Sequence, residues 1–365
     1  MSRRTNFINN IILLALTVGG FAAVVLMANG LWNESLGMVL LYVVCGAVVA
    51  GFFSTLCHEL GHLVSGKING FAFISMTVWF FKWSKERNKI VFDFVMVGEE
   101  AGCTEMAPES VDNLPERLKK MTLGGLFATL IPIAVGIIPF FIAQKLSLFL
   151  FVVWAMFLPI GIYCFFGNAL PISSGGAGND GRVLYGLKKM DDDTKVIINL
   201  LKIQSELFNG KMPAEIDEKY YFDLPQLAED DLNFIILLFS RYDYYLDKKD
   251  YEGAKKVSDR LLTLIEYMPK SFVNTAKANA LYNACSFDKN EDKADDLTYE
   301  IEKFLNKGYG SVEIRAKIAY ILYIKQEKEV LDAFYADGVK AANKCPLRGV
   351  GLFERKLLEE MKKDF

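Results

Sequence analysis

The sequence predicts an all-α polytopic membrane protein with four transmembrane helices, a small interfacial β-hairpin and a cytosolic α-helical repeat domain. Of its 365 residues, 52% are hydrophobic. Residues 1–189 carry 14 Lys/Arg and 11 Asp/Glu, whereas the rest of the chain carries 27 and 33. A charge-poor half with a net charge of +3 therefore precedes an acidic half with a net charge of −6. Apolar residues recur at helical spacing through the second half.

The four transmembrane helices are predicted from stretches without any charged residue. Each stretch holds the roughly 20 apolar residues needed to cross a bilayer, and they are Thr5–Asn33, Ser35–Cys57, Met121–Gln144 and Leu146–Asn179. We expect spans at about 7–28, 36–62, 121–144 and 147–167, which excludes a soluble globular protein. The first stretch could be a cleaved signal peptide, but it far exceeds an h-region of about 7–15 residues. A retained span is therefore favoured.

The orientation follows from the basic residues, which stay on the cytoplasmic side near span ends. With the N-terminus inside, the cytosolic segments hold Arg3 and Arg4, eight Lys/Arg in the loop 65–120, and three just after residue 180. The two outer loops hold only Lys145. This bias predicts a multi-pass protein of the cell membrane with both termini in the cytoplasm. Residues 1–190 would form the transmembrane core and residues 191–365 the cytosolic domain.

The long cytosolic loop has a strand pattern. Phe71–Trp83 and Lys89–Val97 are rich in Phe, Val, Ile and Trp, and they flank the polar turn Ser84–Asn88. This arrangement predicts a β-hairpin over about 71–97. Its apolar content suits the membrane interface, and packing against the spans alone is an equal alternative.

The acidic half shows six apolar stripes at helical spacing, separated by polar turns, which predict stacked helix pairs. They are Leu232–Leu246, Ala254–Met268, Ser271–Cys285, Lys293–Leu305, Val312–Ile324 and Glu329–Ala342. The segment Asp250–Ala254 resembles the start of the second helix of a tetratricopeptide repeat. Ala294 and Ala333 stand in similar settings 40 and 39 residues further on, a longer period than the usual 34 residues.

Composition excludes two further kinds of function. Neither half is strongly basic or carries a basic run interleaved with aromatic residues, so no nucleic-acid partner is expected. The six cysteines show no CxxC spacing, so neither a zinc ribbon nor a redox pair is indicated. Reduced thiols are expected.

The candidate metal-binding and catalytic residues are concentrated at the end of the second span. The chain has two histidines, and both fall in His58-Glu59-Leu60-Gly61-His62. Residues four apart on a helix share a face, so the two imidazoles can bind a single Zn²⁺. Glu59 is then placed to take a proton from the attacking water. The alternative is an ordinary pair of histidines, but ionisable residues inside an apolar segment are costly and usually functional.

A catalytic zinc ion takes three protein ligands and one open position, and no third histidine is present. The remaining ligand is therefore a carboxylate or a thiolate. Cys57 points about 100° away from His58 around the helix, and Cys164 lies within an apolar run, so both suit small buried positions. Asp180 is the better candidate, because it is the first charge after the fourth span and follows a glycine-rich stretch that can fold irregularly. The alternative for Asp180 is a solvated residue that caps a helix from Gly181 onward.

At these residues the chain resembles the site-2 protease family of intramembrane zinc metalloproteases. The resemblance covers roughly residues 35–190 and rests on two motifs: HExxH on one transmembrane helix, and Asn168-x-x-Pro171 followed by Asp180-Gly181 two spans later. The small-residue stretch Gly124–Leu130 in the intervening span is also similar. Asp180 follows Pro171 by nine residues, where the family pattern has five.

The resemblance implies a zinc endopeptidase that cleaves a peptide bond in or near a transmembrane segment of a substrate protein or peptide precursor. It implies that His58, His62 and Asp180 bind one Zn²⁺ and that Glu59 is the general base. Asn168 and Pro171 would lie near the substrate. The domain order is closest to the bacterial sporulation-protease branch, whose soluble domain also follows the membrane core.

Two other classes of function stay open: a non-catalytic membrane binding or escort protein that retains the protease fold, and a transporter or channel. The intact HExxH and the scarcity of ionisable residues in the other spans count against them. The expected partners are the lipid bilayer, a membrane-anchored substrate and a cytosolic protein that binds residues 191–365. The acidic domain favours a basic partner, such as the juxtamembrane part of a substrate. The alternative is a domain that only stabilises the fold or recruits another protein.

Overall fold

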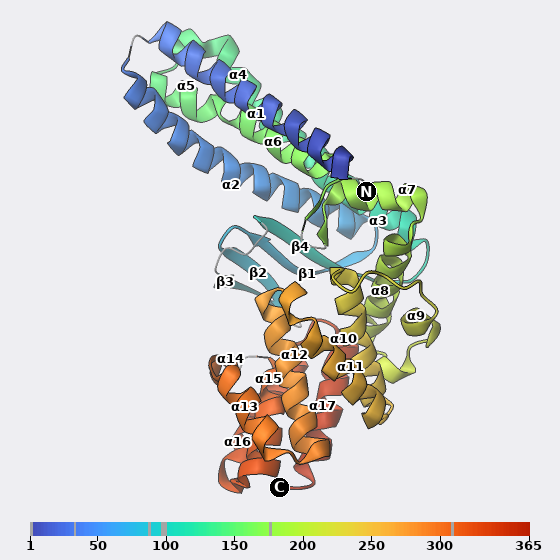
Figure 1. Ribbon diagram of the computed structural model, residues 1–365. Helices are drawn as coiled ribbons and strands as arrows, with labels where there is room; N and C mark the ends of the chain where they lie inside the picture. Colours follow the sequence, from blue (N-terminus) through green and yellow to red (C-terminus); the bar gives the residue numbers. More distant parts are fainter. Residues whose placement is uncertain (1–2, 33, 87–88, 96–100, 175–176, 308–309) are drawn as a thin grey trace.

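The computed structural model describes residues 3–365 except 33, 87–88, 96–100, 175–176 and 308–309. The chain is mostly helical, and a four-stranded antiparallel sheet lies between the bundle of long apolar helices and the C-terminal helices (Figure 1). Helices long and apolar enough to cross a membrane cover Phe7–Leu31, Leu36–Ile68, Leu114–Lys145 and Leu148–Ala169. The four predicted apolar spans are therefore confirmed as helices of sufficient length. The third begins at Leu114, before the expected residue 121, because its helix includes the charged turn with Arg117.

The first two spans are single helices, whereas each of the other two is interrupted. The first span is α1 (Arg3–Leu31) and the second is α2 (Leu36–Ile68). The third consists of α3 (Leu114–Ala128), α4 (Leu130–Ile142) and a 3₁₀ turn at Ala143–Lys145, and the fourth of α5 (Leu148–Ala155) and α6 (Phe157–Ala169). The interruptions fall at Thr129 and Met156, three residues before Pro132 and Pro159. Proline has no N–H to donate, and its ring clashes with the carbonyl four residues earlier. Both interruptions follow from these prolines.

The helices α1, α2, α4, α5 and α6 form an elongated bundle with the sheet at one end (Figure 1). Its core includes Val24 of α1, Val43 of α2 and Phe151 of α5. The beginning of α1 lies at the same end of the bundle as the sheet and α7 (Figure 1). The N-terminal end, the sheet and the C-terminal helices thus share one end of the bundle, as expected if all are on one side of a membrane.

The sheet corrects the prediction of a single hairpin over 71–97. Its strands are β1 (Phe71–Val78), β2 (Phe81–Glu86), β3 (Lys89–Phe94) and β4 (Gly102–Pro108), in the antiparallel order β3-β2-β1-β4. The predicted first strand, Phe71–Trp83, was wrong because a tight turn follows Val78. In that turn Trp79 has a φ of 55°, and the pair Trp79-Phe80 carries none of the residue types that usually mark a turn.

Two further differences concern the ends of this region. The predicted second strand ends at Phe94, and residues 96 and 97 lie outside the described residues. β4 was not predicted, because Gly102, Glu105 and Pro108 belong to types that are depleted in strands. Pairing with β1, from Phe71↔Pro108 to Val78↔Gly102, holds β4 in the sheet.

Every element that the structure describes from Asp180 onward is helical. The α-helices are α7 (Asp180–Lys189), α8 (Asp192–Phe208), α9 (Lys219–Phe222), α10 (Leu232–Asp247), α11 (Tyr251–Thr263), α12 (Lys270–Asn283), α13 (Glu291–Glu300), α14 (Glu302–Lys307), α15 (Ser311–Tyr320), α16 (Leu331–Lys344) and α17 (Arg348–Lys362). All six predicted apolar stripes lie mainly on helices. The six stripes do not include α8, α9 or α17, although helical spacing was expected through the whole second half.

A recurring junction links the helices of this half. Lys249, Lys289 and Gln326 have φ values of 62°, 51° and 57°, and they follow the segments that continue α10, α12 and α15. Asp250 and Asn290 then cap the next helices, α11 and α13, by accepting hydrogen bonds from Gly253 N and Lys293 N. A left-handed residue followed by an N-cap reverses the chain sharply. Successive helices can therefore pack side by side.

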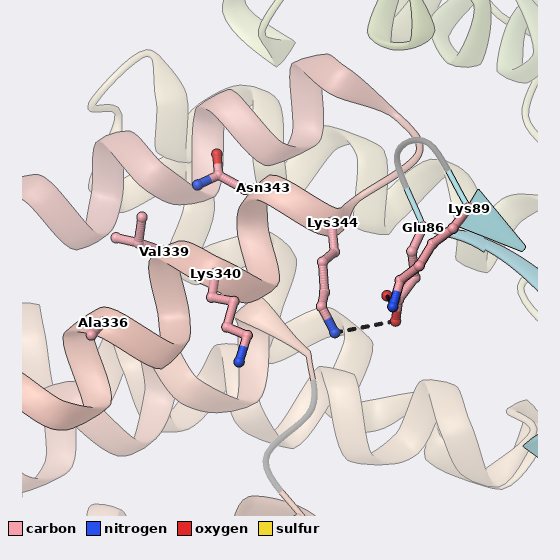
Figure 2. A pocket seen from close by; sticks show the side chains of 7 residues that line it. All are labelled: Glu86, Lys89, Ala336, Val339, Lys340, Asn343 and Lys344. Atoms are coloured by element: carbon pink, nitrogen blue, oxygen red, sulfur yellow. Dashed lines mark hydrogen bonds and ion pairs between the residues drawn. The ribbon is translucent and has the colours of Figure 1, made fainter. Parts of the chain in front are cut away.

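Several contacts join the C-terminal helices to the membrane half, including a 3.0 Å hydrogen bond from Asn209 Nδ2 to Glu109 O. On α8, Ile197 and Leu201 pack against a buried apolar cluster that contains Phe71 of β1 and Leu118 of α3. On α16, Lys344 forms a 3.3 Å ion pair with Glu86 at the end of β2, beside a cavity of about 500 Å³ (Figure 2). The helical half is therefore held against the sheet.

Candidate metal centre

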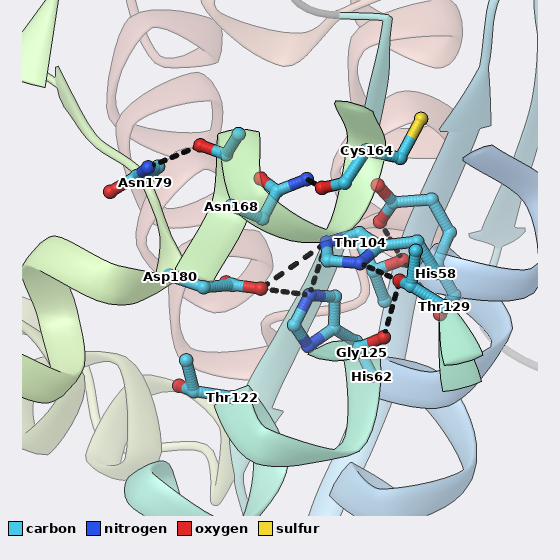
Figure 3. A network of polar contacts seen from close by, with 12 residues as sticks. His58, His62, Thr104, Thr122, Gly125, Thr129, Cys164, Asn168, Asn179 and Asp180 are labelled. Atoms are coloured by element: carbon cyan, nitrogen blue, oxygen red, sulfur yellow. Dashed lines mark hydrogen bonds and ion pairs between the residues drawn. The ribbon is translucent and has the colours of Figure 1, made fainter. Parts of the chain in front are cut away.

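The side chains of His58, His62 and Asp180 point toward one another (Figure 3). His58 and His62 lie one helical turn apart on α2, and their Nε2 atoms are 3.1 Å apart. Asp180, the first residue of α7, places its Oδ2 atom 3.2 Å from both Nε2 atoms. The two histidines are buried, with exposed fractions of 6% and 8%. Three potential ligand atoms thus form a nearly equilateral triangle inside the protein.

Hydrogen bonds on the far side of each ring fix the direction in which the lone pairs point. His62 Nδ1 lies 3.1 Å from the carbonyl oxygen of Met121, so this nitrogen carries the proton and donates it. His58 Nδ1 lies 2.9 Å from Thr129 Oγ1, and that hydroxyl donates its own proton to Gly125 O. His58 Nδ1 is therefore also the donor. In their neutral forms, both rings direct an unprotonated Nε2 into the triangle.

This geometry favours a cation at the centre of the triangle. Two nitrogen lone pairs and a carboxylate oxygen repel one another at 3.1–3.2 Å unless a proton or a metal ion lies between them. Burial raises the pKa of Asp180, whereas hydrogen bonds and positive charge from protonated His58 and His62 rings would lower it, and the lowering dominates. A cation among the three side chains therefore keeps the Asp180 carboxylate charged. Ligands at 2.0–2.1 Å from a tetrahedral ion stand about 3.3 Å apart. The group can hold a metal ion.

Close helix packing places the two histidines. Gly61 of α2 faces Gly124 of α3, and a Cβ atom on either glycine would collide with the opposite backbone. A Cβ atom on Gly125 would enter the His62 ring. The small-residue stretch noted in the sequence thus lets α3 approach α2 closely enough for Met121 and Thr129 to reach the histidines.

The nine-residue interval between Pro171 and Asp180 contains a small hairpin. Strands β5 (Ser173–Ser174) and β6 (Ala177–Gly178) pair with each other, so the chain leaves the end of α6 and returns to it. Asn179 closes this loop: its Nδ2 donates to Gly167 O and Leu170 O, and its Oδ1 accepts from the backbone N–H groups of Ile172 and Arg182. Asp180 comes next, and its position is fixed by these bonds.

The first turn of α7 also needs a close approach to α6. A Cβ atom on Gly181 would collide with the backbone at Ala169 and Leu170. Asp180 is the first residue of α7 and Asn179 is its N-cap. Asp180 is therefore not the solvated cap of a helix from Gly181 that the alternative interpretation expected, because its side chain is largely buried and reaches the two histidines.

Glu59 lies beside the triangle and contacts the sheet. Its Oε2 atom accepts a 2.6 Å hydrogen bond from Thr104 Oγ1 of β4, and the same hydroxyl lies 3.2 Å from the Glu59 carbonyl oxygen. Only 4% of Glu59 is exposed. The Glu59 side chain does not belong to the group of residues that could hold a metal ion.

The other predicted residues lie nearby without joining the ligand group. Asn168 is on α6 near Asp180, and its Nδ2 donates to Cys164 O at 3.0 Å (Figure 3). Pro171 lies just after α6, between that helix and the hairpin. Among the residues that the structure describes, neither Cys57 nor Cys164 belongs to a metal-ligating group. The sequence did not predict Thr104 or Thr129, because each acts through a contact between distant segments. It also did not predict Asn179, whose hydrogen bonds all lie within its own loop and the adjoining helix ends.

Replacing Thr129 by valine is expected to weaken metal binding by a factor of about 10–100, as is typical when a partner of a ligand histidine is lost. Valine has a similar volume but cannot accept the His58 Nδ1 proton, so the ring loses its fixed tautomer and orientation. Competition with a calibrated chelator measures this affinity. Thr122→Val is the control, because Thr122 is equally buried on α3 and bonds only to Leu118 O. Equal affinities of both variants and the wild type would contradict this role.

Comparison of the chain with models of known protein families, with curated proteins and with solved structures finds no match.

Proposed function

We propose that this chain is an intramembrane zinc endopeptidase of the site-2 protease type. The observation that supports the proposal most strongly is the buried His58-His62-Asp180 triangle with Glu59 beside it, inside a bundle of apolar helices. Nitrogen and carboxylate ligands with near-tetrahedral spacing favour Zn²⁺. His62 lies six residues before the end of α2, about 9 Å along the helix axis. The centre would therefore lie near the membrane surface, within reach of water.

Each residue has a defined role in this proposal. His58, His62 and Asp180 would hold the metal as its three protein ligands. A zinc ion bound there would lower the pKa of water to about 7 and polarise the scissile carbonyl. Glu59 takes the proton from the attacking water and passes it to the leaving amine. Thr104 keeps the Glu59 carboxylate turned toward β4, and the fixed position of that strand orients the base.

The sheet offers a way to hold the substrate. A transmembrane helix satisfies all its backbone groups internally, so it must unwind before water can attack a carbonyl. β4 is an outer strand of the sheet and carries Thr104 next to Glu59. An extended substrate segment that pairs with an outer strand gains backbone hydrogen bonds. Pairing along β4 would hold that segment beside the metal centre, on the side of the membrane that carries the sheet, with both termini of the chain in the cytoplasm.

The C-terminal helices, a proposed tetratricopeptide-like repeat domain, would capture the cytosolic part of the substrate. Helical repeats form extended surfaces for peptides, and the Lys344–Glu86 contact places this surface next to the sheet. Deleting residues 211–365 leaves α8 packed on the membrane half. We expect this deletion to slow cleavage of a long substrate about tenfold or more through lost effective concentration, and to leave a tail-less substrate unaffected. Equal effects on both substrates would remove the capture role.

The third ligand can be tested separately. Purified wild-type protein should carry about one zinc per chain, and Asp180→Ala should lose most of it, because two imidazoles alone bind zinc far more weakly than a full three-ligand set. Elemental analysis of the purified chains measures this. Asp192→Ala is a matched control, since Asp192 is exposed and pairs only with Lys195. Full zinc content in Asp180→Ala would move the third ligand elsewhere.

The function is tested by comparing the membrane peptides of cells that carry the wild-type chain with those of cells that carry Glu59→Gln. A peptidase would leave uncleaved membrane-anchored species in the variant, and these species would identify its substrates. Identical peptide profiles would favour the alternative of a non-catalytic binding or escort protein.

A further inference from the structure

A second cavity, of about 320 Å³, opens where the sheet splits near the end of α2. β1 pairs with β2 only from Ser75↔Ser84 to Val78↔Phe81, whereas β2 continues to pair with β3 as far as Glu86↔Lys89. A bulge in β1 between Phe73 and Ser75 adds to the divergence. The first residues of β1 and the end of the β2–β3 pair therefore separate. The space between them is the cavity.

The cavity is basic. Three lysines, Lys67 of α2, Lys85 of β2 and Lys89 of β3, contribute to its lining, together with the acidic residue Glu109. Lys89 forms a 3.6 Å ion pair with Glu86. Within the described part of the chain, Lys67 and Lys85 have no ion-pair partner closer than 4.0 Å. Two unpaired lysines thus face one carboxylate, Glu109, in the lining, and the net charge available to an anion is positive.

The sheet beside this cavity carries an apolar face. Ile90, Phe92 and Phe94 alternate along β3 and therefore share one side of the sheet, and their exposed fractions are 65%, 45% and 72%. Lys85 pairs with Ile90 and Trp83 with Phe92, so both belong to the same side. Trp83 packs in the cluster that contains Phe52 and Leu56 of α2. The basic cavity and the apolar face thus adjoin on the side toward the transmembrane helices.

We propose that this cavity binds the phosphate of an anionic phospholipid. A phospholipid joins a negative phosphate directly to acyl chains, which matches lysines next to exposed aromatic side chains. Lys67 lies in the last turn of α2, where an apolar span ends, so the cavity lies at headgroup level. A free phosphate ion or an acidic peptide would use the lysines but not the apolar face. The site is separate from the metal centre and does not depend on peptidase activity.

The test uses the full-length chain purified in detergent and native mass spectrometry to count retained lipids. Phosphatidylglycerol should be retained over phosphatidylcholine in the wild type. The double variant Lys67→Gln/Lys85→Gln should bind phosphatidylglycerol about thirty-fold more weakly, since each lysine near a membrane surface contributes about a factor of five. Lys67→Arg/Lys85→Arg should retain binding. Lys82→Gln/Lys120→Gln, which removes the same charge outside the cavity, should behave as the wild type.

Two outcomes would overturn the proposal. If the control pair Lys82→Gln/Lys120→Gln weakens binding as much as the cavity pair, the attraction is a general effect of positive charge. If glycerol phosphate, which lacks acyl chains, displaces phosphatidylglycerol at equal concentration, the site recognises phosphate alone and not a lipid. Equal zinc content and equal thermal unfolding of all variants establish that the chains are folded.

Discussion

Replacing Glu59 by glutamine is expected to lower the rate of peptide-bond hydrolysis by a factor of about 10²–10⁴, the range that a general base contributes, and to leave the metal bound. Glutamine keeps the shape of the side chain and can still contact Thr104 Oγ1, but it cannot take a proton from water. His58, His62 and Asp180 are unchanged, so the metal site persists. Cleavage of a purified membrane-segment peptide and elemental analysis of the same sample measure the two effects.

Glu105→Gln is the matched control for this substitution. Glu105 lies on β4 one residue after Thr104, and it accepts a 2.6 Å hydrogen bond from Ser75 Oγ on the other side of the sheet. Its replacement should leave hydrolysis unchanged. Undiminished hydrolysis by Glu59→Gln would assign the base to another residue, and loss of metal in that variant would make Glu59 a ligand.

The second large effect concerns a buried ion pair in the C-terminal helices. Arg315 of α15 and Glu354 of α17 are 0% and 2% exposed, and Arg315 Nε lies 3.0 Å from Glu354 Oε2. Arg315 also donates to Asn279 Oδ1 of α12 and lies over the Tyr282 ring. Glu354→Ala leaves the buried guanidinium without the carboxylate that is hydrogen-bonded to it. This costs about 3–5 kcal/mol of unfolding free energy.

Hydrogen exchange measured on the full-length chain can detect this loss, because it reports local stability element by element. Amides of α12, α15 and α17 should exchange about 10²–10⁴-fold faster in Glu354→Ala, since each 1.36 kcal/mol is a factor of about ten. The double variant Arg315→Met/Glu354→Leu should be less affected, since it removes both charges together. Glu359→Ala is the control, because Glu359 forms an exposed pair with Arg355 on the same helix. Unchanged exchange in Glu354→Ala would contradict this role of the pair.

The sequence predicted the parts of the site that depend on local spacing. The HExxH segment fixes the relative positions of His58 and His62 once it is helical, because helical periodicity alone places residues four apart on one face. Asp180 was the preferred third ligand because few charges were available near the spans. The structure brings these three side chains together, despite the longer interval after Pro171.

The parts that escaped prediction depend on contacts between distant segments. Thr129 and Met121 reach the histidines only because Gly61 and Gly124 allow two helices to approach closely. Thr104 reaches Glu59 from β4, which contains several residue types that are depleted in strands. A single sequence contains no signal for such pairings.

In the fold, too, features set by local sequence could be predicted, whereas features set by contacts between distant segments could not. The four apolar spans and most helices of the second half could be predicted from composition and helical periodicity. The turn at Trp79-Phe80 could not, since apolar residues there continue the strand pattern, and only the pairing of β1 with both β2 and β4 reveals it. The prolines at 132 and 159 could have indicated the two interrupted spans.

The central claim is that residues of this chain form a zinc centre that hydrolyses peptide bonds in membrane segments. The most direct measurement follows cleavage of a helical membrane peptide by the purified, reconstituted chain as zinc is removed with a chelator and then restored. We expect about one zinc per chain, cleavage that stops when zinc is removed and returns when it is restored, and cleavage by Glu59→Gln that is slower by a factor of about 10²–10⁴ at every zinc level. Cleavage that persists in the zinc-free chain, or cleavage at the wild-type rate by zinc-loaded Glu59→Gln, would contradict this claim.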